Sequence, residues 1–285
     1  MLEFDGRKIV LTHDMIVEGV HFLAHDPPAD VAWKLVAVNM SDLAAKGARP
    51  LAALLGYTLG SGDWDRAFSE GLQRALAHFE LPLLGGDTVS VPPGYLRSLG
   101  MTAIGEAEYA PSRTGAKVDD LIWVSGFIGD AHAGLAIDKG RLFGAPILRD
   151  TYRRPSPRLA LGQAVAPYVN AMMDVSDGLF LDLGRIASSA GVSVAVNLDR
   201  IPLSEPYKEA LGNDRAARLL AATGGDDYEL LFTAPPANEA MIKAASEATG
   251  VPVSRIGKVS AGDGLSIRDS AGKVPLPERL GYEHG

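Results

Sequence analysis

Cysteine is absent from this 285-residue sequence, which excludes disulfide bonds, thiolate nucleophiles and zinc sites built on cysteine. Long apolar runs are absent as well. None approaches the roughly 20 residues that a membrane-spanning helix needs, so we expect no membrane partner. The first residues, Met1 to Gly6, lack the basic and apolar pattern of a secretory signal. These absences together favour a cytoplasmic protein.

An excess of positive charge is also missing. The chain has 27 lysines and arginines against 35 aspartates and glutamates, and its formal net charge is −8 at pH 7. Binding of nucleic acid needs a basic surface, so we expect no nucleic-acid partner. An anionic small substrate is compatible with this charge, because Mg²⁺ held by carboxylates reverses the local sign and creates a phosphate site.

The common phosphate-binding loops do not occur in the sequence. It has no Gly-x-x-x-x-Gly-Lys-Ser/Thr loop, and Gly60-Ser61-Gly62 lacks the third glycine of the dinucleotide-binding pattern. The Gly-x-Ser-x-Gly elbow of many hydrolases is missing too. A phosphoryl-transfer enzyme with this sequence must bind phosphate in another way.

Alternating strand and helix patterns run through the whole chain and predict an α/β (α+β) fold. The polar stretch at 106–119 marks a boundary, so we expect two domains, 1–110 and 111–285. The first half shows strand patterns at 8–12, 81–84 and 96–105, and helix patterns at 31–46 and 64–80. The second half shows strands at 121–125, 171–174, 192–197, 228–233 and 251–259, helices after 130 and at 159–166, 179–190 and 237–249, and a long connection at 140–158.

The stretch 171–184 carries the most chemical information. An apolar run ends at Asp174, Ser176 and Asp177 follow, and a helical pattern begins after Gly178. Two carboxylates and a hydroxyl therefore lie where a strand meets a helix N-terminus, a place that suits hard cations and phosphate. The same residues could equally form an ordinary helix cap.

Other aspartates also follow apolar runs or lie beside glycine, serine or threonine. Singly, each could be an ordinary turn or a solvated residue, because aspartate is common in turns. Together, and with only six histidines in the chain, they favour Mg²⁺ over zinc. They are Asp14, Asp42, Asp87, Asp174, Asp177, Asp226 and Asp227.

In their order along the chain, these segments resemble those of the thiamine-monophosphate kinase family, within the aminoimidazole-ribotide synthetase-like superfamily. The matching stretches are 12–22, 33–45, 84–88, 113–117, 174–179, 224–230 and 281–284. The resemblance implies ATP-dependent phosphorylation of thiamine phosphate to thiamine diphosphate, by direct in-line transfer with several Mg²⁺ ions. The acceptor phosphate is already mostly dianionic at neutral pH, so no catalytic base is required. The rate then depends on positioning and charge neutralisation.

The resemblance also implies roles for individual residues. Tyr282 would stack on an aromatic ring of thiamine, and Arg113 would contact the ATP phosphates. The implied Mg²⁺ ligands are Thr12, His13 (through its backbone), Asp14, Asp42, Asp87, Asp174 and Asp177. The implied ATP contacts are Gly86, Arg113 and Ser176, and the implied thiamine contacts are His21, Asp226 and Tyr282.

The sequence departs from the family pattern at three places. His13 replaces a threonine, and Asp226 replaces a glutamate, so the contact of Asp226 reaches less far. Relatives also carry a helix and a Gly-Asp-Asp-Ala-Ala segment, whose aspartate binds Mg²⁺, before residues like those that follow Met1 here. We expect the natural start to lie upstream of Met1, which the intact mass of the native protein would test. If the chain begins at Met1, kinase activity would be reduced or lost.

Two alternatives stay open at this point. One is another ATP-using member of the superfamily, of the selenophosphate synthetase or hydrogenase-maturation type, although the lack of cysteine disfavours the former. The other is a non-catalytic nucleotide-binding paralogue. By resemblance, the N-terminal sheet domain would form a homodimer, which would cover otherwise exposed edge strands. The C-terminal α/β domain would close over the nucleotide.

Overall fold

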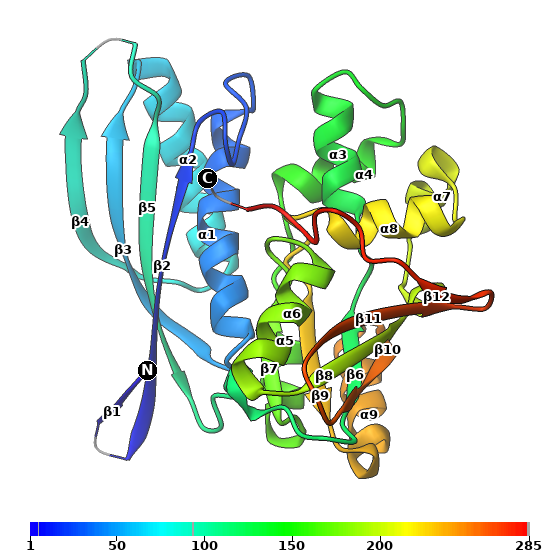
Figure 1. Cartoon of the computed structure of the whole chain (residues 1–285). Helices are drawn as coiled ribbons and strands as arrows, with labels where there is room; N and C mark the ends of the chain where they lie inside the picture. The colour runs from blue at the N-terminus through cyan, green and yellow to red at the C-terminus, as the bar shows by residue number, and fades with distance from the viewer. Residues whose placement is uncertain (5, 93, 284–285) are drawn as a thin grey trace.

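The computed structural model describes residues 1–4, 6–92 and 94–283, so His284 of the last motif lies outside the described residues. The described chain forms two β-sheets (Figure 1). The first sheet has the order β1-β2-β5-β3-β4. Its strands are β1 (Leu2–Phe4), β2 (Arg7–Val17), β3 (Arg49–Leu59), β4 (Leu83–Ser90) and β5 (Ser98–Ala107), and its helices are α1 (Pro28–Ala44) and α2 (Gly62–His78).

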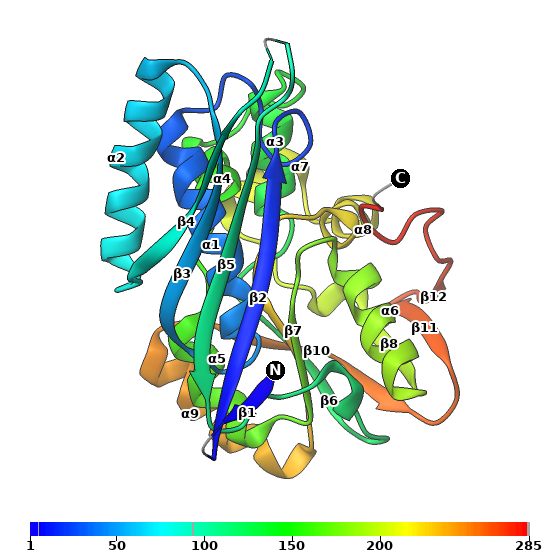
Figure 2. The ribbon, with the colours of Figure 1, turned by 90° about the vertical axis from the view of Figure 1, so that its left-hand side faces the viewer.

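One face of this first sheet is packed and the other is open. Along β2, Val10 and Ile16 are buried, whereas Leu11 and Met15 are exposed, as the two-residue period of a strand requires. Helix α1 lies on the packed face, between the sheet and the second half of the chain (Figure 1). In the part of the chain that the structure describes, no helix covers the opposite face, seen in Figure 2.

The second sheet has seven strands in the order β12-β11-β8-β10-β6-β9-β7. Its strands are β6 (Leu121–Ser125), β7 (Ala171–Asp174), β8 (Ser193–Asn197), β9 (Leu230–Ala234), β10 (Val253–Ser260), β11 (Gly264–Asp269) and β12 (Gly272–Val274). Its α-helices are α3 (Asp130–Asp138), α4 (Pro146–Arg153), α5 (Leu159–Val165), α6 (Leu179–Ala190), α7 (Glu205–Leu211), α8 (Arg215–Thr223) and α9 (Glu239–Thr249). Short 3₁₀ turns lie at η1 (Arg113–Gly115), η2 (Ala166–Tyr168), η3 (Leu198–Arg200) and η4 (Pro236–Asn238).

This arrangement confirms the predicted α/β (α+β) class and most of the predicted elements. Helix α6 ends at Gly191, whose left-handed backbone (φ 66°) forms the expected C-cap. The predicted strand 8–12 was too short: β2 continues to Val17, so Asp14 lies inside the strand. No helix among the described residues is long and apolar enough to cross a bilayer.

Other predictions of local structure were wrong. The 140–158 connection contains helix α4, which begins at Pro146 and buries Leu148 and Tyr152, four residues apart on one face. Strand β4 runs from Leu83 to Ser90, so Gly86 and Asp87 belong to a strand and not to a turn that closes it. Strands β1, β3, β11 and β12 and helices α7 and α8 were not predicted.

Candidate active site

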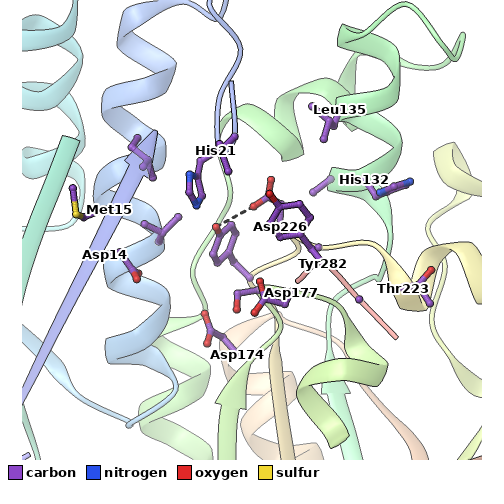
Figure 3. A pocket seen from close by; sticks show the side chains of 18 of the residues that line it. Asp14, Met15, His21, His132, Leu135, Asp174, Asp177, Thr223, Asp226 and Tyr282 are labelled. Atoms are coloured by element: carbon purple, nitrogen blue, oxygen red, sulfur yellow. Dashed lines mark hydrogen bonds between the residues drawn. The ribbon is translucent and has the colours of Figure 1, made fainter. Parts of the chain in front are cut away.

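A cavity of about 560 Å³ lies between the two halves of the chain (Figure 3). Strand β2 contributes Asp14 to its wall, helix α1 contributes Asp42, and the end of β7 contributes Asp174. The loop before β9 contributes Asp226, and the C-terminal segment contributes Tyr282. The cavity is thus built from segments that are far apart in the sequence.

Four carboxylates that line this cavity form its acidic end: Asp14, Asp42, Asp174 and Asp177. Burial, together with repulsion by Asp42 and Asp177, raises the pKa of Asp14 to about 7. Burial, followed by repulsion from Asp42, raises the pKa of Asp174 to about 8. Burial also raises the pKa of Asp42. The carboxylates therefore lie close enough to repel one another, and a bound cation would relieve that repulsion.

One turn of α1 holds the acidic end together. The Ser41 hydroxyl, which is fully buried, donates to Asp174 Oδ2 at 2.6 Å and so connects the two halves. Asp42 accepts a short hydrogen bond from the Thr12 hydroxyl, and Asn39 Oδ1 accepts from the backbone N–H of Asp14 at 3.3 Å. No role was predicted from the sequence for Asn39 or Ser41. They could have been found from the sequence as polar residues in an otherwise apolar helix, because a buried polar group needs a hydrogen-bond partner.

The segment that follows β7 is held by Asp182 on helix α6. Its Oδ2 accepts from three consecutive backbone N–H groups, those of Ser176 and Asp177 at 3.1 Å and that of Gly178 at 3.2 Å. Arg185 Nη1 donates to Asp182 Oδ1 and to Asp177 Oδ2, both at 2.6 Å. Burial raises the pKa of Asp182 to about 6, although Arg185 opposes the rise. Neither Asp182 nor Arg185 was singled out from the sequence.

A second group of residues that line the cavity, here called the aromatic end, comprises His21, Asp226, Tyr228 and Tyr282. It adjoins the acidic end, because the Tyr282 N–H donates to the Asp177 carbonyl at 2.8 Å. The Tyr228 hydroxyl donates to Asp226 Oδ1 at 3.1 Å, dashed in Figure 3. The Val17 N–H donates to His21 Nδ1 at 3.1 Å, so a neutral His21 ring carries its proton on Nε2. Asp226 and Tyr228 have positive φ values of 72° and 51°, and such strain in non-glycine residues concentrates at functional sites.

The structure brings most of the residues suggested by the resemblance to this cavity. Arg113 is exposed, yet it lies close enough to Asp42 to oppose the rise in the pKa of that carboxyl. Thr12 reaches the site through its bond to Asp42. The residues that line the cavity directly are Asp14, His21, Asp42, Asp174, Ser176, Asp177, Asp226 and Tyr282.

Gly86, Asp87 and the side chain of His13 lie away from this cavity within the chain. Strand pairing places Asp14 opposite Met101, Met101 opposite Leu55, and Leu55 opposite Gly86. Gly86 therefore lies three strands away from Asp14, about 14 Å at the usual strand spacing. Asp87 follows it on the exposed edge strand β4, and the exposed His13 side chain bonds Thr102.

The acidic end suits a hard cation by its chemistry, since all of its donors are oxygen atoms. Among the described residues, no three histidine or acidic side chains already stand in an arrangement that could hold a metal ion. Burial, and then repulsion among the carboxylates, raises the pKa values of Asp14 and Asp174, although Arg185 pairs with Asp177. These residues fit Mg²⁺ as a ligand set that a bound cation would draw together.

The raised pKa values predict how the stability of the metal-free protein depends on pH. Between about pH 4 and 8 the folded protein binds more protons than the unfolded chain at Asp14 and Asp174, so the free energy of unfolding falls as pH rises. From pH 6 to 8 we expect a loss of about 2–4 kcal/mol. Thermal melts in EDTA would measure it, and a melting temperature that rises over this range would contradict the prediction.

Residues 1–107 match the family model for AIR synthase related protein, N-terminal domain, and residues 117–270 match the model for the C-terminal domain. Thiamine-monophosphate kinase of Salmonella typhimurium is 39% identical over 290 residues, which cover 98% of this chain and 87% of that protein.

Solved structures show the same likeness. The crystal structure of thiamine-monophosphate kinase from Stenotrophomonas maltophilia K279a is 38% identical, with a TM-score of 0.85 over 92% of this chain and 86% of that chain. AaThiL complexed with AMPPCP and TMP is 30% identical, with a TM-score of 0.86 over 99% of this chain and 89% of that chain.

Proposed function

This chain belongs to the thiamine-monophosphate kinases of the AIR synthase related family, and we propose from this that it transfers the γ-phosphoryl group of ATP to thiamine phosphate. AaThiL has been solved with AMPPCP, a non-hydrolysable ATP analogue, and with TMP, which supports the same pair of substrates here. The observation that carries the proposal is the single cavity that joins an acidic end to an aromatic end.

Each end of the cavity suits one part of the reaction. The acceptor is a phosphate oxygen that is already mostly ionised at neutral pH, so the main barrier is repulsion between two polyanions. In our proposal Thr12, Asp14, Asp42, Asp174 and Asp177 hold Mg²⁺, with the backbone of His13. Bound Mg²⁺ would supply charge neutralisation and orientation for the phosphates. The displacement would then be in-line, and no protein group needs to remove a proton.

Other residues of the chain would bind and orient the substrates. We propose that Arg113 and Ser176 contact ATP, with Arg113 near its phosphates. At the aromatic end, Tyr282 would stack on a thiamine ring, and His21 would donate a hydrogen bond from Nε2. Asp226 lines the cavity (Figure 3), where its carboxylate would face the cationic thiamine.

We further propose that the chain works as a homodimer of two-domain subunits, with domains at 1–110 and 111–285. The open sheet face carries exposed apolar residues such as Leu11, Met15 and Leu54, and the free edge β4 exposes Leu84. A second copy would cover this surface and the unpaired edge. It would also offer Gly86 and Asp87, which lie too far from Asp14 within one chain, to the site of its partner.

The proposed reaction is tested by ADP release. We expect turnover that requires both thiamine phosphate and Mg²⁺, stops with EDTA and yields thiamine diphosphate as the second product. Turnover of ATP without thiamine phosphate, or with a different acceptor only, would indicate another ATP-using member of the superfamily. Binding of ATP without any turnover would indicate a non-catalytic paralogue. Either result would overturn the proposal.

A further inference from the structure

Lys34 on helix α1 is a charged side chain that the proposed chemistry does not use. It is only 2% exposed, so it cannot reach solvent. Burying an ammonium group is unfavourable unless opposite charge and hydrogen-bond acceptors surround it. The position of these acceptors indicates what the residue does.

The Lys34 ammonium contacts three separate segments of the chain. Nζ donates to the backbone carbonyl of His21 at 2.9 Å and to Asp226 Oδ2 at 2.9 Å. It also lies 4.0 Å from the centre of the Tyr152 ring on α4, within the range of a cation–π contact. One buried cation therefore joins the β2–α1 loop, the loop before β9 and helix α4.

Two of these three partners belong to the aromatic end of the cavity. His21 comes from the first half of the chain and Asp226 from the second, 205 positions apart in the sequence. With Lys34 on Oδ2 and Tyr228 on Oδ1, both oxygens of Asp226 are oriented before any substrate binds. Lys34 does not line the cavity, so its effect on a ligand must pass through these neighbours.

We propose that Lys34 is a positioning residue that sets the affinity for the organic part of thiamine phosphate by fixing His21 and Asp226 relative to each other. The inference rests on the proposed function of this cavity. We expect its effect to fall mainly on the aromatic end, since Lys34 Nζ contacts His21, Asp226 and Tyr152 and none of these is an acidic-end carboxylate. Affinity for ATP should therefore be largely independent of Lys34.

The test is steady-state kinetics on Lys34→Met, which keeps the unbranched stem and removes the charge. We expect KM for thiamine phosphate to rise about tenfold or more, KM for ATP to change less than about twofold, and kcat to fall less than KM rises. Lys243→Met is the matched control, because Lys243 makes only an exposed pair with Glu239 on α9. A merely structural role would instead change both KM values and kcat together with the melting temperature.

A double-mutant cycle distinguishes the loss of the Lys34–Asp226 contact from a general loss of structure. Lys34→Met leaves the Asp226 carboxylate without its ammonium partner, whereas Lys34→Met with Asp226→Asn leaves no such unpaired charge. We expect the Lys34 substitution to matter much less in the Asp226→Asn background, and equal effects in both backgrounds would overturn the inference. If Lys34→Met does not fold, Lys34→Arg replaces it in the same cycle, since its planar group cannot reproduce all three contacts.

The two proposals fail in different ways. If the wild-type protein does not turn over thiamine phosphate, the proposed function is wrong. If it does, and Lys34→Met keeps the wild-type KM for thiamine phosphate, only the role of Lys34 is wrong.

Discussion

Replacing Asp174 with asparagine is expected to lower kcat for thiamine phosphate by about 10²–10³-fold, the usual scale for removing one preorganised electrostatic group. The variant should keep its fold, because the asparagine Oδ1 can still accept from Ser41 as Asp174 Oδ2 does. The loss would come from the missing charge, since the amide binds a hard cation far less well than a carboxylate.

The same substitution should stabilise the metal-free protein. Repulsion from Asp42 and Asp14 contributes to the raised pKa of Asp174, and a neutral amide removes that repulsion. We therefore expect a higher melting temperature in EDTA for Asp174→Asn than for the wild type at pH 8, together with a smaller stabilisation by added Mg²⁺. Asp63→Asn is the control, because the Asp63 side chain is 96% exposed on α2. Turnover within tenfold of wild type would contradict the role of Asp174.

Sequence patterns predicted which helices and strands exist better than they predicted where each one begins and ends. The helical spacing of apolar residues in α1 and α6, and the cap at Gly191, could be recognised because each depends only on residues close in the sequence. Helix α4 was missed because Pro146 and Pro155 looked like breaks, although proline at the first helical position starts a helix. Strand β3 was missed because residues 51–55 are all apolar, so the run lacks the alternation expected of a strand with one open face.

Site residues could be predicted from the sequence where their side chain type alone indicates metal binding. Residues that act through a contact with a distant part of the chain could not be predicted. Carboxylates beside glycine or serine gave Asp14, Asp42, Asp174 and Asp177 as candidates, and the structure gathers them at one cavity. The residues that orient them, Ser41 and Asp182, are ordinary in sequence. Only the fold shows that Ser41 lies 2.6 Å from Asp174 although 133 positions separate them.

Asp87 lies three strands from Asp14, about 14 Å at the usual strand spacing, so the two carboxylates of one chain are too far apart to bind the same metal ion. If Asp87 serves the partner's site, Asp87→Asn and Asp174→Asn homodimers should both be nearly inactive. A heterodimer of the two chains would contain one intact site and one doubly altered site. We expect the purified heterodimer, made by co-expression with two affinity tags, to regain about half of the wild-type turnover, a gain of about 10²-fold or more over either parent.

The reciprocal pairing makes this result decisive. A heterodimer of a wild-type chain with a chain carrying both substitutions has the same composition, but a shared site predicts that both of its sites are damaged. If the site is shared, this second heterodimer should be nearly inactive. If each site lies within one chain, the second heterodimer should be about half active and the first heterodimer nearly inactive. The two pairings thus give opposite outcomes for the same two substitutions. A monomer in solution at working concentrations, with full activity, would exclude any contribution from a partner's Asp87.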